Sequence, residues 1–256
     1  MEPIAFVLIK LSAINGLFYR CAGGKDRPVF HDIQKTCPQL SRLQEIYPII
    51  RQEVEGLLIT GISIPRYGDL DRAQYVISEG ADPSKNWKIF VFNALGEKPE
   101  MSRRFCPRTA AILDEIPDVY QAFFSILDPG KSVPAHCAPY LGYLRYHLAL
   151  KVPATNPPSI RIKDQHYTWK EGESILFDDS WEHEVYNRSD DLRVVLIVDV
   201  FRPMPFFARQ VNRLAYLIGR FTYGKMIMKN LKLAQPPARI AETNGRGPGE
   251  SREQLR

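Results

Sequence analysis

A succession of short β-type segments, separated by turns rich in Gly, Pro and Asp, most constrains how this chain can fold. Residues that favour strands alternate with turn residues from position 87 to position 201, and most neighbouring segments have no helical stretch between them. Such a pattern is typical of a sandwich or barrel and not of alternating β–α units. The predicted strands are 87–93, 122–127, 143–152, 165–169, 174–177, 183–187 and 192–201.

Helical patterns flank this β region. In 40–58, apolar residues recur at spacings of three and four, and Pro48 is expected to kink the helix or to begin its second half. After Pro203 and Pro205, which end the β region, a basic amphipathic helix is expected over 206–233. The predicted parts are a helical region packing on the core (1–80), a β domain (81–203), an amphipathic helix (204–234) and a disordered tail (235–256).

The composition excludes several classes of protein. A hydrophobic content of 45% and a charged content of 25% are ordinary for a soluble globular chain, and they exclude a mainly disordered or polytopic membrane protein. The four cysteines are too scattered for a close-paired zinc or redox site, so a reducing cytoplasm is the expected location. The sequence has no nucleic-acid motif, phosphate-binding loop or nucleophile elbow, and nucleic acid is therefore not an expected partner.

Two segments bear on contact with a membrane. The apolar run from Pro3 to Tyr19 is shorter than the roughly 20 residues that span a bilayer, so a buried or interfacial helix is expected there. The segment from Pro203 to Lys232 contains six basic residues and no acidic one. A cationic amphipathic helix suits peripheral contact with the anionic inner face of a membrane. It suits equally well a helix that packs its apolar side on the barrel, and the sequence does not indicate the oligomeric state.

Two predicted strands carry charged residues where apolar ones are usual. Residues two apart share a strand face, so Arg145 and His147 point one way while Tyr146 and Leu148 point the other way. Arg193 lies within a β-branched run. A buried guanidinium needs a partner, and we therefore expect a place for an anion. Two such cations suit a dicarboxylate, which arginine binds with its two-pronged group.

Two histidines are candidate metal ligands. His136 and His183 lie on or beside separate predicted strands, and two neutral imidazoles suit a divalent first-row metal. The usual iron site adds a carboxylate two residues after the first histidine, but this chain has Ala138 there. Asp178 and Asp179 are candidates for a replacement ligand, although structural hydrogen bonding in the turn before His183 is favoured. The spacing alone leaves a structural role for both histidines open.

Several ordered motifs resemble the aspartyl/asparaginyl β-hydroxylase family of iron(II)/2-oxoglutarate-dependent oxygenases, whose bacterial branch includes lipid acyl-chain hydroxylases. The spacing is also similar, with nine positions from His136 to Arg145 and ten from His183 to Arg193. The resemblance implies a double-stranded β-helix core, which is a jelly-roll of the cupin type, in a chain that is mainly β with flanking helices. The motifs are HCAP (136–139), LRYHLAL (144–150), WKEGE (169–173), FDDSWEHEV (177–185) and RVVLIVDV (193–200).

The resemblance implies that His136 and His183 hold iron(II). The family characteristically lacks the third carboxylate and usually has Gly two residues after the first histidine, where water fills the vacant ligand position. Ala138 differs from that Gly only by a methyl group, which offers no ligand.

The resemblance also implies a binding site for 2-oxoglutarate. Arg193, with Ser125 nearby, would anchor the distal carboxylate. Arg145 and His147 would be partners of the metal-binding end. Trp87 aligns with a tryptophan near the cosubstrate.

The expected reaction is hydroxylation of an unactivated C–H bond with 2-oxoglutarate and O2 as cosubstrates, releasing succinate and CO2. The substrate is expected to be either an Asp or Asn side chain in a peptide or protein, or the acyl chain of a lipid. Two alternatives stay open. An iron-dependent halogenase would use the vacant ligand position for chloride, and a catalytically inactive jelly-roll binding module would keep the fold alone.

Overall fold

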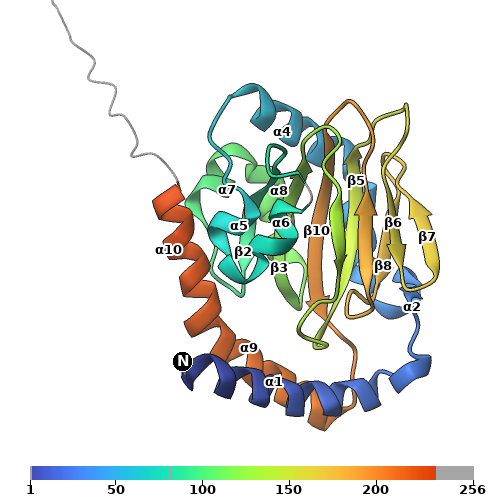
Figure 1. Cartoon of the computed structure of the whole chain (residues 1–256), viewed down its shortest axis with the longest axis vertical. Coiled ribbons are helices and arrows are strands. Elements are labelled where there is room, and N and C mark those ends of the chain that lie inside the picture. Colours follow the sequence, from blue (N-terminus) through green and yellow to red (C-terminus); the bar gives the residue numbers. More distant parts are fainter. Residues whose placement is uncertain (1, 81, 235–256) are drawn as a thin grey trace, which may run out of the picture.

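Two antiparallel sheets facing each other form the body of the protein in the computed structural model, which describes the backbone of residues 2–80 and 82–234 and the side chains from residue 12 onward (Figure 1). The tail predicted at 235–256 lies outside the described residues. The larger sheet has the order β1 (Phe30–His31), β8 (Ser174–Phe177), β5 (Tyr143–Lys151), β10 (Arg193–Phe201), β3 (Val119–Leu127) and β2 (Trp87–Ala94). The smaller sheet has the order β4 (Val133–His136), β9 (His183–Tyr186), β6 (Ser159–Ile162) and β7 (Gln165–Thr168). The predicted jelly-roll core with flanking helices is confirmed.

The predicted strands are all present, but three short strands were missed. These are β1, β4 and β6, of two to four residues each. In β4, Pro134 argued against a strand because proline cannot donate a ladder hydrogen bond. The structure resolves the conflict by placing β4 at the edge of the smaller sheet, with an irregular register against β9, where proline is tolerated.

The helices of the N-terminal part are shorter than the periodicity predicted. The helix expected at 40–58 is divided into α3 and α4, and Pro48 lies in the first turn of α4, as in the second of the two alternatives. The helices are α1 (Glu2–Cys21), α2 (Ile33–Thr36), α3 (Ser41–Glu45), α4 (Tyr47–Ile59), α5 (Tyr67–Leu70), α6 (Tyr75–Glu79), α7 (Glu100–Phe105), α8 (Pro107–Glu115), α9 (Phe206–Gly219) and α10 (Lys225–Ala234). Single turns are η1 (Gly24–Asp26), η2 (Pro38–Leu40), η3 (Arg72–Gln74) and the π-helical η4 (Arg220–Gly224).

The outer face of the larger sheet carries the main apolar core. Strand alternation sends Leu144, Tyr146, Leu148 and Leu150 of β5 to this face, where all four are fully buried. They pack in one cluster with α4, α8 and the outward residues of β2, β3 and β10. This cluster holds the sheet rigid behind the site.

The inner faces of the two sheets enclose a second cluster. Phe123, Trp169, Phe177 and Val195 contribute to it from both sheets or their connections. The same space also contains buried charged and polar side chains, which the next section describes.

Helices α1 and α9 lie together at one end of the body (Figure 1). Phe18 of α1 and Ala208 of α9 are buried there against Tyr140 and Tyr143. The Asn15 amide donates to the Pro139 carbonyl and its oxygen accepts from Leu141 N–H. No described helix combines the length and apolar character needed to cross a bilayer.

Candidate active site

One cavity between the two sheets is lined by every residue that the sequence singled out for metal or cosubstrate binding. The cavity measures about 30 Å³, well below the roughly 300 Å³ and more of ordinary small-molecule pockets. The predicted residues in its lining are Trp87, Ser125, His136, Arg145, His147, His183 and Arg193, and the apolar ones are Leu127, Val133, Ile160, Phe177, Val185 and Ile197.

The two candidate metal ligands lie directly opposite each other on paired strands. His136 of β4 is the register partner of His183 of β9, and the centroids of their rings are 4.2 Å apart. His136 Nδ1 is 2.8 Å from the Pro134 carbonyl, and His183 Nδ1 is 2.9 Å from the Trp181 carbonyl. Because a carbonyl only accepts, each Nδ1 carries the proton and each Nε2 keeps a free lone pair, as a metal ligand requires.

Burial keeps both rings neutral. Burial, together with the neighbouring His136, lowers the pKa of His183 to about 3. Burial likewise lowers the pKa of His136, against the opposing effect of the hydrogen bond to Pro134. Neutral imidazole is the form that binds a metal, so the pair is ready at neutral pH.

The described residues provide no third His, Cys, Asp or Glu that would complete a metal-binding group with the pair. The carboxylate of Asp178 accepts from Arg27 Nε and Ser180, and its Oδ1 lies 2.8 Å from Arg202 Nη2. Its predicted structural role is confirmed. Asp179 differs because its carboxylate makes no hydrogen bond in the structure and instead lies 3.2 Å from Arg145 Nη1.

Arg145 already has its counter-charges. Asp199 accepts from Nε and Nη2 of Arg145, each at 2.8 Å, and Asp179 adds a second carboxylate. The sequence predicted that both Arg145 and Arg193 need a bound anion as partner, and for Arg145 this is wrong because two aspartates balance its charge. The side chain of Arg145 does line the cavity, as predicted. The sequence could have suggested Asp199 as an internal counter-charge, since this residue shares a strand face with Arg193 inside a β-branched run.

Arg193 is a buried cation that forms no ion pair with any described residue. Its side chain is 2% exposed, and its guanidinium lies 4.0 Å from the centre of the Trp169 ring. Nη1 donates to Ser125 Oγ at 3.3 Å, whereas Nε and Nη2 have no partner. Burial lowers the pKa of Arg193 to about 9, so the group is still charged at neutral pH. A cation buried in this way is costly unless an anion binds to it.

Ser125 and His147 offer further open hydrogen-bonding groups. Ser125 Oγ accepts from Trp87 Nε1 at 2.9 Å and from Arg193, which occupies both acceptor positions and leaves its hydrogen for another acceptor. Both ring nitrogens of His147 are buried without a partner. Burial, with the charge of Arg193, lowers the pKa of His147 well below its usual value, so the ring is neutral.

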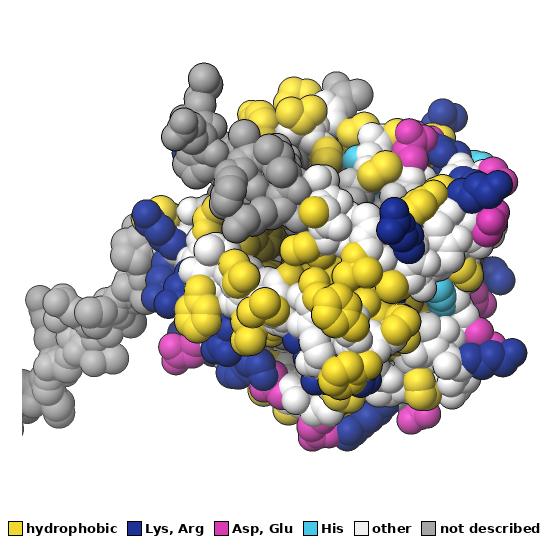
Figure 2. Space-filling view, turned by 90° about the horizontal axis from the view of Figure 1, so that it is seen from below, with side chains coloured by type: hydrophobic (Ala, Val, Ile, Leu, Met, Phe, Trp, Pro, Cys, Tyr) yellow, Lys and Arg dark blue, Asp and Glu magenta, His cyan; other side chains and the backbone are white. Residues whose placement is uncertain are grey.

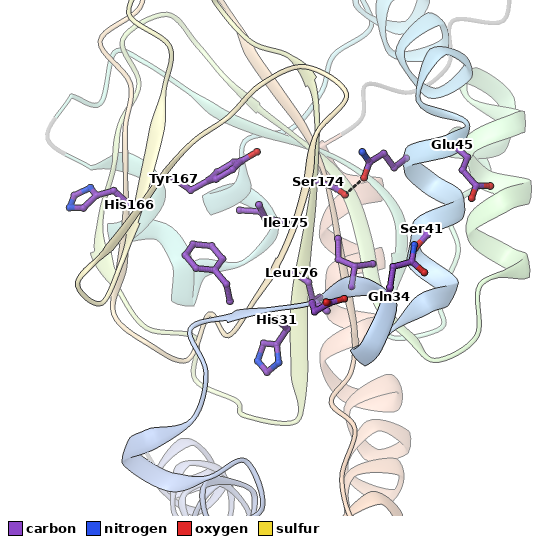
Figure 3. A pocket seen from close by; sticks show the side chains of 13 residues that line it. His31, Gln34, Ser41, Glu45, His166, Tyr167, Ser174, Ile175 and Leu176 are labelled. Atoms are coloured by element: carbon purple, nitrogen blue, oxygen red, sulfur yellow. Dashed lines mark hydrogen bonds between the residues drawn. The ribbon is translucent and has the colours of Figure 1, made fainter.

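A larger groove of about 700 Å³ lies elsewhere, between α2, α3 and the strands β7 and β8 (Figure 3). Figure 3 shows His31 and His166 on separate elements, pointing away from each other. The lining contains Asp32 and Glu45 but neither Lys nor Arg. An anionic ligand therefore has far better partners in the inner cavity.

Comparison with known proteins gives one family. The family model described as "Aspartyl/Asparaginyl beta-hydroxylase" matches residues 44–203. The chain is 39% identical over 188 residues to the "Ornithine lipid ester-linked acyl 2-hydroxylase" of Rhizobium tropici, covering 73% of this chain and 66% of that protein. It is 34% identical over 123 residues to the human "Aspartyl/asparaginyl beta-hydroxylase", covering 46% of this chain and 16% of that protein.

The match thus spans less than two thirds of the length of either relative. Among solved structures, a predicted oxalate decarboxylase from Thermotoga maritima aligns with 56% of this chain and 95% of its own, at 13% identity and a TM-score of 0.36. A likeness this distant adds nothing on function.

Proposed function

Because the chain belongs to the aspartyl/asparaginyl β-hydroxylase family, we propose that it is an iron(II)- and 2-oxoglutarate-dependent dioxygenase that hydroxylates an unactivated C–H bond. The observation that carries this proposal is the pairing of two features in one cavity. A facing pair of neutral imidazoles with free Nε2 atoms suits a ferrous ion, and the unpaired guanidinium of Arg193 suits the carboxylate of a diacid.

His136 and His183 would hold the metal through Nε2, since their Nδ1 atoms are engaged with backbone carbonyls. Iron(II) with 2-oxoglutarate and O2 would supply the oxidising power, placing one oxygen atom in the C–H bond of the substrate and the other in succinate as CO2 leaves. The task of this chain is to bind, orient and exclude water.

Arg193 and Ser125 would bind the distal carboxylate of 2-oxoglutarate. The two partnerless nitrogens of Arg193 and the unused hydrogen of Ser125 together offer donors to carboxylate oxygens. Trp169 lies against the guanidinium and Trp87 holds the serine oxygen, so both donors are positioned before the ligand arrives.

His147 and Arg145 would act at the metal-binding end of the cosubstrate. Neutral His147 has one N–H donor and one acceptor nitrogen, both free. Asp199 and Asp179 fix the position of Arg145 and offset its charge, so it would steer orientation more than affinity. The apolar side chains around these groups would keep bulk water away from the reacting atoms.

For the substrate, we propose a lipid acyl chain. The relative with the longer match, from R. tropici, is named as an acyl 2-hydroxylase of a lipid. The human relative carries a name that refers to Asp and Asn residues, which makes a peptide side chain the second candidate.

The test is succinate formation by the purified chain with iron(II), 2-oxoglutarate and O2. Ornithine-containing lipid and Asp- or Asn-containing peptides are supplied in separate reactions, and each product is examined by mass spectrometry for one added oxygen atom. We expect succinate and an oxygenated lipid in equal amounts.

Omission of 2-oxoglutarate and the variant His136→Ala serve as controls, and both should give no product. Absence of succinate with every substrate would refute the proposal and favour a non-catalytic binding module. A chlorinated product that appears only with chloride would indicate halogenation instead.

A further inference from the structure

Helix α9 contacts the protein mainly through small and polar side chains, with Val211 and Tyr216 half-buried beside them. Ala208 and Asn212 are buried, and Ala215 and Gly219, at the next positions of the same helix face, are half-buried. Asn212 donates to the Gly142 carbonyl and accepts from the Tyr140 hydroxyl. The attachment of α9 to the body thus leaves most of its large apolar side chains unused.

The large apolar side chains of α9 point outward instead. Spacings of three and four place them on one helix face, which we call the α9 face, and Figure 2 shows apolar side chains gathered across this end of the molecule. Exposed fractions on the face range from 49% for Leu217 to 71% for Phe207. The α9 face consists of Phe206, Phe207, Leu214, Leu217, Ile218 and, just beyond the helix, Phe221.

The neighbouring helix α10 differs from α9 in the direction of its apolar side chains. Ile227 and Leu231 of α10 are buried, so this helix packs its apolar residues inward. Of the two interpretations of the basic C-terminal segment, packing on the body therefore applies to α10 and is wrong for α9. An apolar stripe left in water over a whole helix is unusual in a monomer and indicates a partner.

Basic residues border the α9 face. Arg209, Arg213 and Arg220 follow one side of the stripe at spacings of four and seven, and all three are exposed. Lys225 lies 5.2 Å from the ring of Phe221. No acidic residue occurs between positions 203 and 232. From other elements, Asp118 lies 4.0 Å from Arg213 and Glu97 lies 3.3 Å from Arg220, so cations still exceed carboxylates along the border.

The α9 face lies at the metal-binding end of the barrel. Helix α1 packs against α9, and Asn15 of α1 bonds to residues 139 and 141, just after His136. The guanidinium of Arg27, which follows η1, lies 3.6 Å from the centre of the Trp181 ring and pairs with Asp178, in the loop before His183. The same end of the molecule thus contacts both segments that carry the histidine pair.

We propose that the α9 face is a docking surface for the anionic surface of a lipid bilayer. Its apolar stripe would enter the headgroup region while the arginines contact lipid phosphates. Pairing of two copies through this face would bring six arginines together with only Asp118 and Glu97 of each copy beside them, and charge complementarity disfavours this excess of like charge. Docking would bring acyl chains to the histidine pair, a consequence that rests on the proposed function.

Sedimentation of the full chain with vesicles tests the docking surface without iron or 2-oxoglutarate. Vesicles of phosphatidylcholine with phosphatidylglycerol are compared with phosphatidylcholine alone. We expect binding to the mixed vesicles that weakens as salt rises, and much weaker binding to the neutral ones. Failure of the unaltered chain to bind mixed vesicles would overturn the proposal.

Variants assign the binding to the face. Phe207→Ser with Phe221→Ser should weaken binding at least about tenfold, because two aromatic rings no longer enter the bilayer. The matched control is Ile59→Ser with Val76→Ser, which removes two side chains that are 86% and 79% exposed on α4 and α6, and it should bind normally. Equal loss in both pairs would contradict a specific face.

The cationic border is tested in the same way. Arg209→Gln with Arg213→Gln should weaken binding by about fivefold for each side chain, whereas Lys35→Gln with Lys170→Gln should have no effect. Near-ultraviolet circular dichroism verifies that each variant is folded. Self-association of the chain, relieved by the phenylalanine variants, would identify a second copy as the occupant and refute membrane docking.

The outcomes separate this proposal from the proposed function. Vesicle binding without succinate formation would leave the docking surface standing and refute the enzyme. Succinate formation from lipid in detergent, by a chain that does not bind vesicles, would support the enzyme and refute the docking surface.

Discussion

The two faces of the larger sheet are made by the same strands but differ in what they contain. On the outer face, Tyr146 and Leu148 of β5 belong to a continuous apolar cluster. On the inner face, Arg145 and His147 of the same strand border a narrow cavity. The alternation of a single strand thus separates the part of the protein that stabilises the fold from the part that is equipped for chemistry.

The difference also appears in hydrogen bonding. Both ring nitrogens of His147 and two nitrogens of Arg193 are buried on the inner face without partners. Each such group costs free energy in the ligand-free protein. The outer cluster must therefore stabilise a site that by itself opposes folding, and the variants below should separate the two contributions.

The largest effect is expected from His183→Ala on the inner face. Loss of one of the two imidazoles should weaken metal binding by well over about 100-fold, the effect that even a partner of a metal ligand can have. Calorimetric titration with cobalt(II), together with succinate formation, measures this. Unchanged cobalt affinity would show that the facing rings are not the metal site.

The counterpart on the outer face is Leu196→Ala in β10. Leu196 is fully buried in the outer cluster, so the cavity should lower the free energy of unfolding by about 2–5 kcal/mol. The KM for 2-oxoglutarate should stay within a factor of two (roughly the spread of such measurements), because the side chain points away from the site. Denaturant unfolding and steady-state kinetics check both. A large rise in KM would mean that the faces are not independent.

Arg193→Met should show, at a single position, that the same side chain favours ligand binding and lowers the stability of the ligand-free protein. The affinity for 2-oxoglutarate should fall by about 10- to 100-fold, from the loss of roughly 1.5–3 kcal/mol of charged hydrogen bonding. The ligand-free protein should become more stable by about 1 kcal/mol or more, because a buried unpaired charge is removed. Isothermal titration and denaturant unfolding measure the two effects.

A matched control for Arg193→Met is Arg202→Met. Arg202 is also buried, at 4% exposed, but it is paired with Asp178 at 2.8 Å. Its replacement should destabilise the protein by about 3–5 kcal/mol by leaving that carboxylate without one of its cations. Destabilisation by both variants would show that Arg193 has a partner after all.

The inner face should also make stability depend on pH. Burial lowers the pKa values of His136, His147 and His183, so these rings bind protons more readily in the unfolded chain, and stability falls as pH decreases below about 6.5. Burial raises the pKa of Asp179 to about 7, which acts in the opposite sense. Three rings oppose one carboxyl, so these groups should lower the stability of the metal-free protein by roughly 1–3 kcal/mol per pH unit between about pH 6.5 and 5.

The variant His147→Leu should reduce that slope by about half, since one titrating ring is lost. Denaturant unfolding at several pH values measures it. A slope that does not change would mean that His147 is already protonated, or solvated, in the folded protein.

Much of the fold could be predicted because its strands have a strong alternating pattern. The strand at 174–177 was expected with the bounds that β8 has. The short strand β4 was not expected, since Pro134 is compatible with a strand only at the edge of a sheet, and a single sequence does not reveal which strands are edges.

The site was predictable from motifs, but its electrostatics were not. Which charges meet depends on register, and Arg145 faces Asp199 only because β5 and β10 pair at these residues. The contact of Trp169 with Arg193 depends on how the two sheets face each other, because Trp169 follows β7 of the smaller sheet and Arg193 begins β10 of the larger one. The sequence therefore predicted that Arg145 and Arg193 both need a bound anion, whereas in the structure only Arg193 of these two lacks a counter-charge.

The hydrogen bonds of His136 and His183 have a consequence for metal exchange. Each ring is hydrogen-bonded to the backbone carbonyl two residues before it, so its orientation is set locally and does not depend on the opposite sheet. Departure of a bound ion would leave both rings aimed as before, with little reorganisation on return. Metal binding would then require little change in the protein, and zinc, cobalt or manganese should bind to and dissociate from the folded protein reversibly.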